Sequence, residues 1–207
     1  MFNLAGWQSG YAAACKAVNA GSIPASASIN IMNNTKALFL DRDGVINHNF
    51  GYVYKIDDFK FIDGIFDLVR AARKKEYLII IVTNQAGIGR GFYTEADFLA
   101  LMKWVKMKFE EKKIPIDDIF FSPFHPVSGI GEYKKDSYLR KPNPGMLFNA
   151  QKKYKIDLSK SIIIGDKISD VEAGQSAGLG TNILFSEDKV FKNTIIIDHL
   201  SKAINYL

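Results

Sequence analysis

Short, almost wholly apolar runs alternate with amphipathic segments from Lys36 to the end of the chain. The runs are apolar on both faces and rich in isoleucine, which is typical of strands buried in a parallel sheet. We predict six strands: Ala37–Asp41, Tyr77–Thr83, Asp118–Ser122, Ser161–Gly165, Thr181–Phe185 and an edge strand at Thr194–Asp198.

The amphipathic segments predict four helices: Ile62–Lys74, Thr94–Lys112, Pro144–Tyr154 and Ser169–Ala177. In the second helix apolar residues gather on one face and lysines on the other, and Thr94 with Asp97 forms a capping box at its start. Strands that alternate with helices form right-handed βαβ units. The predicted fold class is therefore α/β, a Rossmann-like core in which a doubly wound, mainly parallel sheet lies between two helical layers.

Residues 1–31 differ from the rest, since Lys16 is their single charged residue and no helical or alternating pattern is present. They do not fit a signal peptide, because Lys16 lies mid-segment and polar residues interrupt the apolar stretch. The string GWQSGYAAACKAVNAGSIPASAS resembles the translation of a bacterial transfer-RNA gene. We therefore expect one domain, 32–207, that begins at Met32; the alternative is a genuine disordered extension.

Composition excludes several classes of protein. The 207 residues are 47% hydrophobic and 24% charged, enough for a buried core, and no apolar run is long enough to span a membrane. The single cysteine, Cys15, excludes a disulfide scaffold and fits a reducing compartment. The net charge of +5 suits anionic partners without identifying one. We expect a cytoplasmic monomer that binds neither nucleic acid nor a membrane.

Acidic residues follow two of the predicted strands, at the sheet edge where doubly wound folds bind ligands. Asp41 and Asp43 lie two positions apart before Gly44, and Asp166 follows another apolar run. A single Asp at a strand end is usually a helix N-cap. Three converging acids instead favour a hard cation such as Mg²⁺.

Thr83 and Asn84 offer a hydroxyl and backbone N–H groups that could hold phosphate oxygens, while Arg140 and Lys141 supply positive charge. Together these groups favour one chemistry. A carboxylate attacks phosphorus, a cation and a lysine neutralise the phosphoryl oxygens, and a second carboxyl group protonates the departing oxygen.

The strings DRDGVIN, VTNQ, RKPNPG and GDKISD, in this order, resemble the four motifs of the haloacid dehalogenase (HAD) superfamily of aspartate-nucleophile phosphatases. The resemblance covers residues 36–185. TNQAGIGRG and HNFGYVYKIDDFKF resemble the branch that acts on heptose 1,7-bisphosphate or histidinol phosphate. It implies a Mg²⁺-dependent phosphatase for a small sugar bisphosphate, in the synthesis of lipopolysaccharide or another surface glycan.

The resemblance also implies individual roles. Asp41 would be the nucleophile and Asp43 the general acid and base, while Thr83 and Lys141 would stabilise the phosphoryl group. Mg²⁺ would be held by Asp41, the Asp43 carbonyl and Asp166. The positions that match substrate contacts are Asn49, Phe50, Gly51, Tyr52, Asn84, Gln85, Ala86 and Arg140, with Lys167 in the same site.

The chain departs from many members of the branch in the loop before RKP, where they carry a structural zinc. The matching triplets are Ser122-Pro123-Phe124 and Ser137-Tyr138-Leu139, without a zinc ligand at any position. We therefore expect no zinc, and a loop held by packing of Phe121, Phe124 and Tyr138. His125, like His48 and His199, is expected to be a surface or packing residue.

The segments 43–83 and 122–141 are too short to contain a large cap domain. We therefore expect an open site whose selectivity comes from loops 50–52 and 128–140. Histidinol-phosphate phosphatase activity is the alternative within the branch. A nucleic-acid 3′-phosphatase and a binding protein without turnover are more distant alternatives; the latter is disfavoured because Asp41 and Asp43 are both present.

Overall fold

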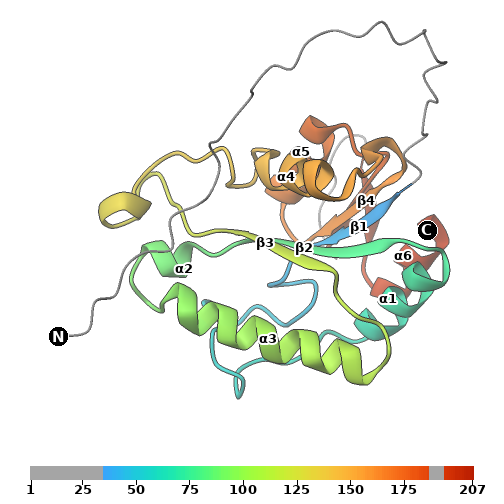
Figure 1. Ribbon diagram of the computed structural model, residues 1–207, viewed down its shortest axis with the longest axis horizontal. Coiled ribbons are helices and arrows are strands. Elements are labelled where there is room, and N and C mark those ends of the chain that lie inside the picture. The colour runs from blue at the N-terminus through green and yellow to red at the C-terminus, as the bar shows by residue number, and fades with distance from the viewer. Residues whose placement is uncertain (1–34, 187–193) are drawn as a thin grey trace, which may run out of the picture. The chain divides into compact units, whose positions relative to one another are not determined.

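The computed structural model describes residues 35–186 and 194–207. The expected domain start at Met32 lies outside these residues, and so does the N-terminal segment. Within the described part, six parallel strands form one sheet in the order β3-β2-β1-β4-β5-β6 (Figure 1). The strands are β1 (Ala37–Leu40), β2 (Leu78–Asn84), β3 (Asp118–Ser122), β4 (Ile162–Gly165), β5 (Thr181–Phe185) and β6 (Ile195–Ile197). This confirms the predicted α/β class and the predicted parallel sheet.

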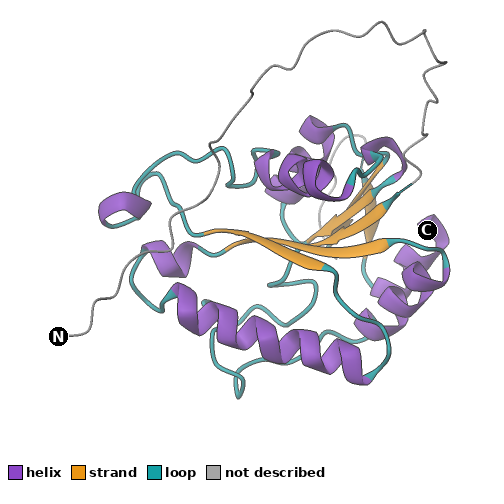
Figure 2. Cartoon of the chain, in the orientation of Figure 1, coloured by secondary structure: helices purple, strands orange, loops and turns teal. Residues whose placement is uncertain are grey.

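Helices cover both faces of the sheet (Figure 2). They are α1 (Ile65–Lys74), α2 (Ala86–Gly89), α3 (Glu95–Glu111), α4 (Gly145–Tyr154), α5 (Ile168–Ala177) and α6 (Leu200–Ala203). Helices α1, α3 and α6 pack on one face and α4 and α5 on the other. No helix in the described ranges is long and apolar enough to cross a membrane.

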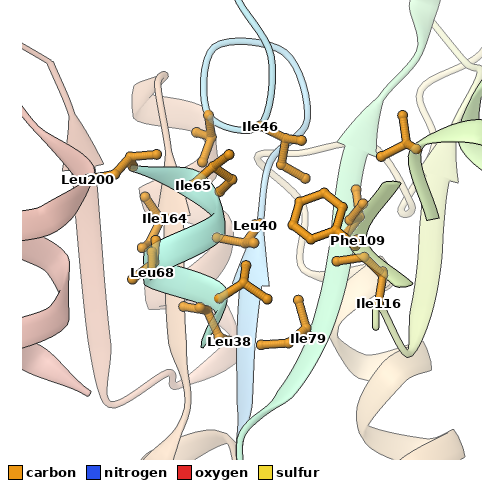
Figure 3. Close-up of a cluster of buried hydrophobic side chains, with 14 of the residues drawn as sticks. Leu38, Leu40, Ile46, Ile65, Leu68, Ile79, Phe109, Ile116, Ile164 and Leu200 are labelled. Carbon is orange, nitrogen blue, oxygen red and sulfur yellow. The ribbon is translucent and has the colours of Figure 1, made fainter. Parts of the chain in front are cut away.

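The core consists of two apolar layers, one on each side of the sheet. Successive side chains of a strand point to opposite faces, so Leu38 and Leu40 join the layer under α1 and α3, while Phe39 joins the layer under α4 and α5. Figure 3 shows the first layer, where Leu40 lies among side chains from α1, α3 and β4. Because both faces are buried, β1 is apolar at every position.

Two helix starts show how local chemistry sets the boundaries. Thr94 accepts a hydrogen bond from the Asp97 backbone N–H at 3.1 Å and its own N–H donates to Asp97, which confirms the predicted capping box. Helix α1 begins at Ile65, three residues later than predicted, because Gly64 has a φ of 81° and cannot continue a right-handed helix.

The chain order crosses over between β1 and β4. From β1 it runs outward through β2 to β3, and then returns to the other side of β1 as β4. At such a switch point the loops after the two neighbouring strands diverge and leave a crevice. Asp41 follows β1 and Asp166 follows β4, so the fold places both acids at this crevice.

Candidate functional site

Three carboxylates meet at the crevice. Oxygen atoms of Asp41, Asp166 and Asp170 all lie within 4.8 Å of one another. Asp41 is anchored by its backbone N–H, which donates to Ile164 of β4 at 3.0 Å. Asp170 lies in the first turn of α5 and is 1% exposed. Asp170 was not among the predicted site residues, although it is the second acid of the GDKISD string.

Lys141 lies buried against two of these acids. Its Nζ is 2.9 Å from Asp41 Oδ1 and 2.5 Å from Asp170 Oδ1, and it donates to the Val82 carbonyl at 2.7 Å. Burial alone would lower the pKa of Lys141, but Asp170 and Asp41 raise it above its ordinary value. The lysine is therefore a fixed positive charge beside Asp41.

The carboxylates fit a divalent cation. Burial, and then the nearby Asp41, raise the pKa of Asp166 to about 7, and burial also raises the pKa of Asp41 against the opposing effect of Lys141. The Asp166 Oδ1 atom is buried without a hydrogen-bond partner. Crowded carboxylate oxygens with an unsatisfied acceptor are the donor set that Mg²⁺ prefers.

The Asp43 side chain lies outside this cluster of three and is held by other partners. Its Oδ1 accepts from Arg42 Nη2 at 2.6 Å and from Asn47 Nδ2 at 3.0 Å, and its Oδ2 accepts from Gln85 Nε2 at 3.1 Å. Arg42 is fully buried and also donates to the Val53 carbonyl. The Asp43 carboxyl group is thus fixed in orientation.

Asn84, the last residue of β2, and Gln85, which follows it, were predicted to contact substrate, but the structure gives both side chains internal partners. Asn84 and Lys141 form a reciprocal pair, with Asn84 Nδ2 donating to the Lys141 carbonyl at 2.9 Å and the Lys141 N–H donating to Asn84 Oδ1 at 3.0 Å. Gln85 Nε2 also donates to Thr83 Oγ1 at 2.8 Å. The Asn84 side chain therefore positions Lys141.

Arg90, Arg140 and His125 form a basic cluster that lines the same cavity as Asp41 and Lys141. Arg90 donates to the Tyr52 hydroxyl and to Ser128 Oγ, and its Nη2 lies 3.4 Å from His125 Nε2. Arg140 donates to the Phe124 carbonyl, and burial followed by Arg90 lowers its pKa. Among residues 35–186 and 194–207, neither arginine has an acidic partner in an ion pair. Arg90 and His125 were not predicted site residues.

One cavity of about 560 Å³ joins the acids and the basic cluster. Its lining includes the predicted Asp41, Asp43, Asn49, Gly51, Tyr52, Thr83, Asn84, Gln85, Ala86, Arg140, Lys141 and Lys167. Two predicted residues do not line it. Asp166 lies in the carboxylate cluster with Asp41 and Asp170, and Phe50 is 61% exposed and lines a neighbouring hollow. A larger hollow of about 890 Å³ between α3 and β3 is mainly apolar and lies apart from the acids.

The loop that lacks zinc ligands is held differently from the prediction. Phe121 packs on Phe98 and Phe124 packs on Tyr133, with ring centroids 4.7 and 6.0 Å apart. Tyr138, which we expected in this packing, is 60% exposed, so that part of the prediction was wrong. The Tyr133 carbonyl also accepts from the His125 backbone N–H.

An acid cluster and a buried lysine at the switch point of an open α/β sheet are suited to an enzyme that transfers phosphoryl groups. A family model described as "HAD-hyrolase-like" matches residues 138–201. The chain is 54% identical over 152 residues to D-glycero-alpha-D-manno-heptose-1,7-bisphosphate 7-phosphatase of Burkholderia mallei, covering 73% of this chain and 80% of the relative.

A second relative is the D-glycero-beta-D-manno-heptose-1,7-bisphosphate 7-phosphatase of Haemophilus influenzae, which is 46% identical to this chain. The match covers 74% of this chain and 83% of the relative. The crystal structure of D,D-heptose 1,7-bisphosphate phosphatase from B. bronchiseptica, complexed with magnesium and phosphate, shares the fold. The two structures superpose with a TM-score of 0.72 at 24% sequence identity, and the match covers 83% of this chain and 97% of the other. The chain belongs to the HAD-like phosphatase family that contains these heptose bisphosphate phosphatases.

Proposed function

We propose that this phosphatase removes the 7-phosphate of D-glycero-D-manno-heptose 1,7-bisphosphate through an aspartyl-phosphate on Asp41. The observation that carries the proposal is the Asp41 carboxylate, paired with the buried Lys141 at 2.9 Å. The names of the two most similar relatives reported above support this substrate. They do not favour histidinol phosphate.

In the first step an Asp41 oxygen attacks phosphorus and the bond from phosphorus to the C7 oxygen breaks. Lys141 neutralises charge on the phosphoryl oxygens, and the Thr83 hydroxyl lies in the same cavity. Asp43, in its protonated form, gives its proton to the departing alkoxide. Phosphate monoesters hydrolyse extremely slowly in water, so the rate depends on both the positive charge of Lys141 and the proton from Asp43.

In the second step Asp43, now ionised, takes a proton from a water molecule. The resulting hydroxide attacks phosphorus and breaks its bond to Asp41, which releases inorganic phosphate and restores the carboxylate. Asp166, Asp41 and the Asp43 carbonyl are the groups that we assign to Mg²⁺. When bound, the ion would offset the charge that gathers on the phosphoryl oxygens.

A bisphosphate carries a second phosphate that does not react, and the basic cluster provides a place for it. Arg90, Arg140 and His125 line the same cavity as Asp41. His125 Nδ1 accepts from the backbone N–H groups of Val127 and Ser128, so the ring proton lies on Nε2. Both Nε2–H and Arg90 Nη2 are therefore donors, and an anion would satisfy both.

We further infer that the enzyme works as a cytoplasmic monomer in the synthesis of a heptose-containing surface glycan. The test of the proposal is phosphate release from heptose 1,7-bisphosphate and from histidinol phosphate, each with and without Mg²⁺. We expect Mg²⁺-dependent turnover with a clear preference in kcat/KM for the heptose substrate. A preference for histidinol phosphate would overturn the substrate.

The nucleophile is tested separately. Asp41→Asn should abolish phosphate release while circular dichroism and Tm show a folded protein, since an amide is a far weaker nucleophile than a carboxylate. Turnover by folded Asp41→Asn at the wild-type rate would overturn the mechanism.

A further inference from the structure

A chain of hydrogen bonds connects a tyrosine to the Asp43 carboxylate. The Tyr93 hydroxyl donates to Gln85 Oε1 at 2.6 Å, and Gln85 Nε2 donates to Asp43 Oδ2 at 3.1 Å. The same Nε2 donates to Thr83 Oγ1 at 2.8 Å. The Gln85 amide thus touches two predicted catalytic residues at one end and Tyr93 at the other.

Electrostatics fixes which way the Gln85 amide faces. When Asp43 is ionised, as in the second step of the proposed reaction, a turned amide would place its oxygen against the carboxylate and the two acceptors would repel. With the nitrogen toward Asp43, the oxygen faces Tyr93 and needs a donor. The Tyr93 hydroxyl is that donor, so it fixes the orientation of the amide.

The surroundings keep this arrangement rigid. Gln85 is 1% exposed, and its backbone N–H donates to the Ser122 carbonyl of β3 at 2.8 Å. The Tyr93 ring is buried and stacks on Tyr54, with centroids 5.1 Å apart and an interplanar angle of 9°. Burial raises the pKa of Tyr93 to about 12, so the hydroxyl keeps its proton across the working range.

We propose that Gln85 and Tyr93 are positioning residues, which hold the Asp43 carboxyl group where it can protonate the departing oxygen. This inference rests on the roles of Asp41 and Asp43 in the proposed function. It also revises the predicted role of Gln85, because both polar atoms of its side chain are engaged within the protein and its amide serves Asp43 instead of the substrate.

The leaving group distinguishes a positioning role from a structural one. A sugar alkoxide is strongly basic and must receive a proton from Asp43 as its bond to phosphorus breaks. A p-nitrophenolate ion is a weak base and leaves without that proton. Since kcat/KM covers only steps up to the first irreversible one, it reports the transfer to Asp41 and not the later attack of water.

The experiment compares Tyr93→Phe with wild type on heptose 1,7-bisphosphate and on p-nitrophenyl phosphate. The variant keeps the stacked ring and removes one donor, so we expect kcat/KM for the sugar phosphate to fall by about tenfold, the scale of one lost hydrogen bond. The value for p-nitrophenyl phosphate should fall far less. The ratio of the two is independent of how much of the variant is folded.

Tyr54→Phe is the matched control, because it removes a hydroxyl from the other ring of the stack. Among the described residues no hydrogen bond of the Tyr54 hydroxyl is found, so its ratio should equal that of wild type. Gln85→Met, which removes both amide groups at similar volume, should shift the ratio in the same direction as Tyr93→Phe and further.

A selective loss on the sugar phosphate in both variants supports the inference. Equal losses on the two substrates, or no loss in either variant, would overturn it. If wild type fails to cleave heptose 1,7-bisphosphate, the substrate proposal falls, yet the comparison still tests Tyr93 with any alkyl phosphate that the enzyme does cleave.

Discussion

Gly44 has a φ of 90°, and a Cβ built on it would lie 2.2 Å from Asp166 Oδ2. The position therefore combines a left-handed backbone with close approach of an acid from the neighbouring strand. Gly178 has a φ of 76°, but a Cβ there would meet nothing within 4 Å. Comparing a substitution at Gly44 with the same substitution at Gly178 therefore separates the effect of backbone strain from that of contact with Asp166.

We expect Gly44→Ala and Gly178→Ala each to lose about 1–2 kcal/mol of unfolding free energy, the cost of placing a Cβ in the left-handed region. Gly44→Ala should in addition lose the rise in Tm that Mg²⁺ produces, because its methyl group displaces Asp166. Urea unfolding and thermal shift measure the two effects. An unchanged Mg²⁺ response in Gly44→Ala would contradict this account of the cluster.

Arg90 was missing from the predicted site, because a lone arginine in a glycine-rich loop has no periodic signal. The structure places it beside His125 and Arg140. Arg90→Met should raise KM for heptose 1,7-bisphosphate by tenfold or more, since a hydrogen bond to a charged group is worth about 1.5–3 kcal/mol. For heptose 7-phosphate, which lacks the second phosphate, the change in KM should be smaller. Equal changes for both substrates would argue against a second phosphate at Arg90.

At the level of elements, the residue pattern predicts the sheet well because every buried strand must be apolar on both faces. Each end of the six strands lies within one residue of its predicted position. Helix α2 was not predicted, since its four residues include Gly87 and Gly89 and show no helical period. Helix α6 is equally short. Such elements depend on tertiary contacts that no local pattern records.

The candidate site, like the secondary structure, could be predicted only in part from the sequence. Acids at strand ends could be placed from the sequence, because topology brings the ends of parallel strands together. The internal partners of Asn84 and Gln85 could not, since they depend on loops that fold back from distant positions. Tyr133, instead of Tyr138, packs on Phe124 for the same reason: residues 123–141 have no period from which to infer which ring faces inward.

The reciprocal pair between Asn84 and Lys141 joins the end of β2 to the loop before α4. Asn84→Ala leaves the Lys141 N–H and carbonyl without these partners, so we expect the unfolding free energy to fall by about 1–3 kcal/mol. Because Lys141 would lose its anchor, kcat should fall as well. Asn143→Ala, which removes one hydrogen bond to the Ser137 carbonyl, is the control and should lose less of both. Full activity in Asn84→Ala would show that Lys141 is placed by other contacts.

For the molecule as a whole, the crowded acids predict that stability depends on Mg²⁺. The single positive charge of Lys141 offsets only part of the charge of three carboxylates whose oxygens lie within 4.8 Å of one another, so a divalent cation should stabilise the cluster further. Mg²⁺ at 100 times its Kd should add about 2.7 kcal/mol to the unfolding free energy, and EDTA should remove that gain.

Asp166→Asn removes one of the repelling charges. Its Tm in EDTA should therefore equal or exceed that of wild type, while its response to Mg²⁺ should disappear. Asp136→Asn changes the net charge equally at an exposed position and should respond to Mg²⁺ as wild type does. A wild-type Mg²⁺ response in Asp166→Asn would remove Asp166 from the metal site.

The central claim is that phosphorus becomes bonded to Asp41 during turnover. The most direct measurement mixes Asp43→Asn, in which attack of water is slowed, with Mg²⁺ and p-nitrophenyl phosphate, whose leaving group needs no proton from position 43. The mixture is quenched in acid and its peptides are mapped by mass spectrometry. We predict a phosphoryl group on the peptide that contains Asp41, and its conversion to homoserine at position 41 after borohydride reduction. A phosphoryl group on another residue, or phosphate released from this variant at the wild-type rate with no labelled peptide, would contradict the account.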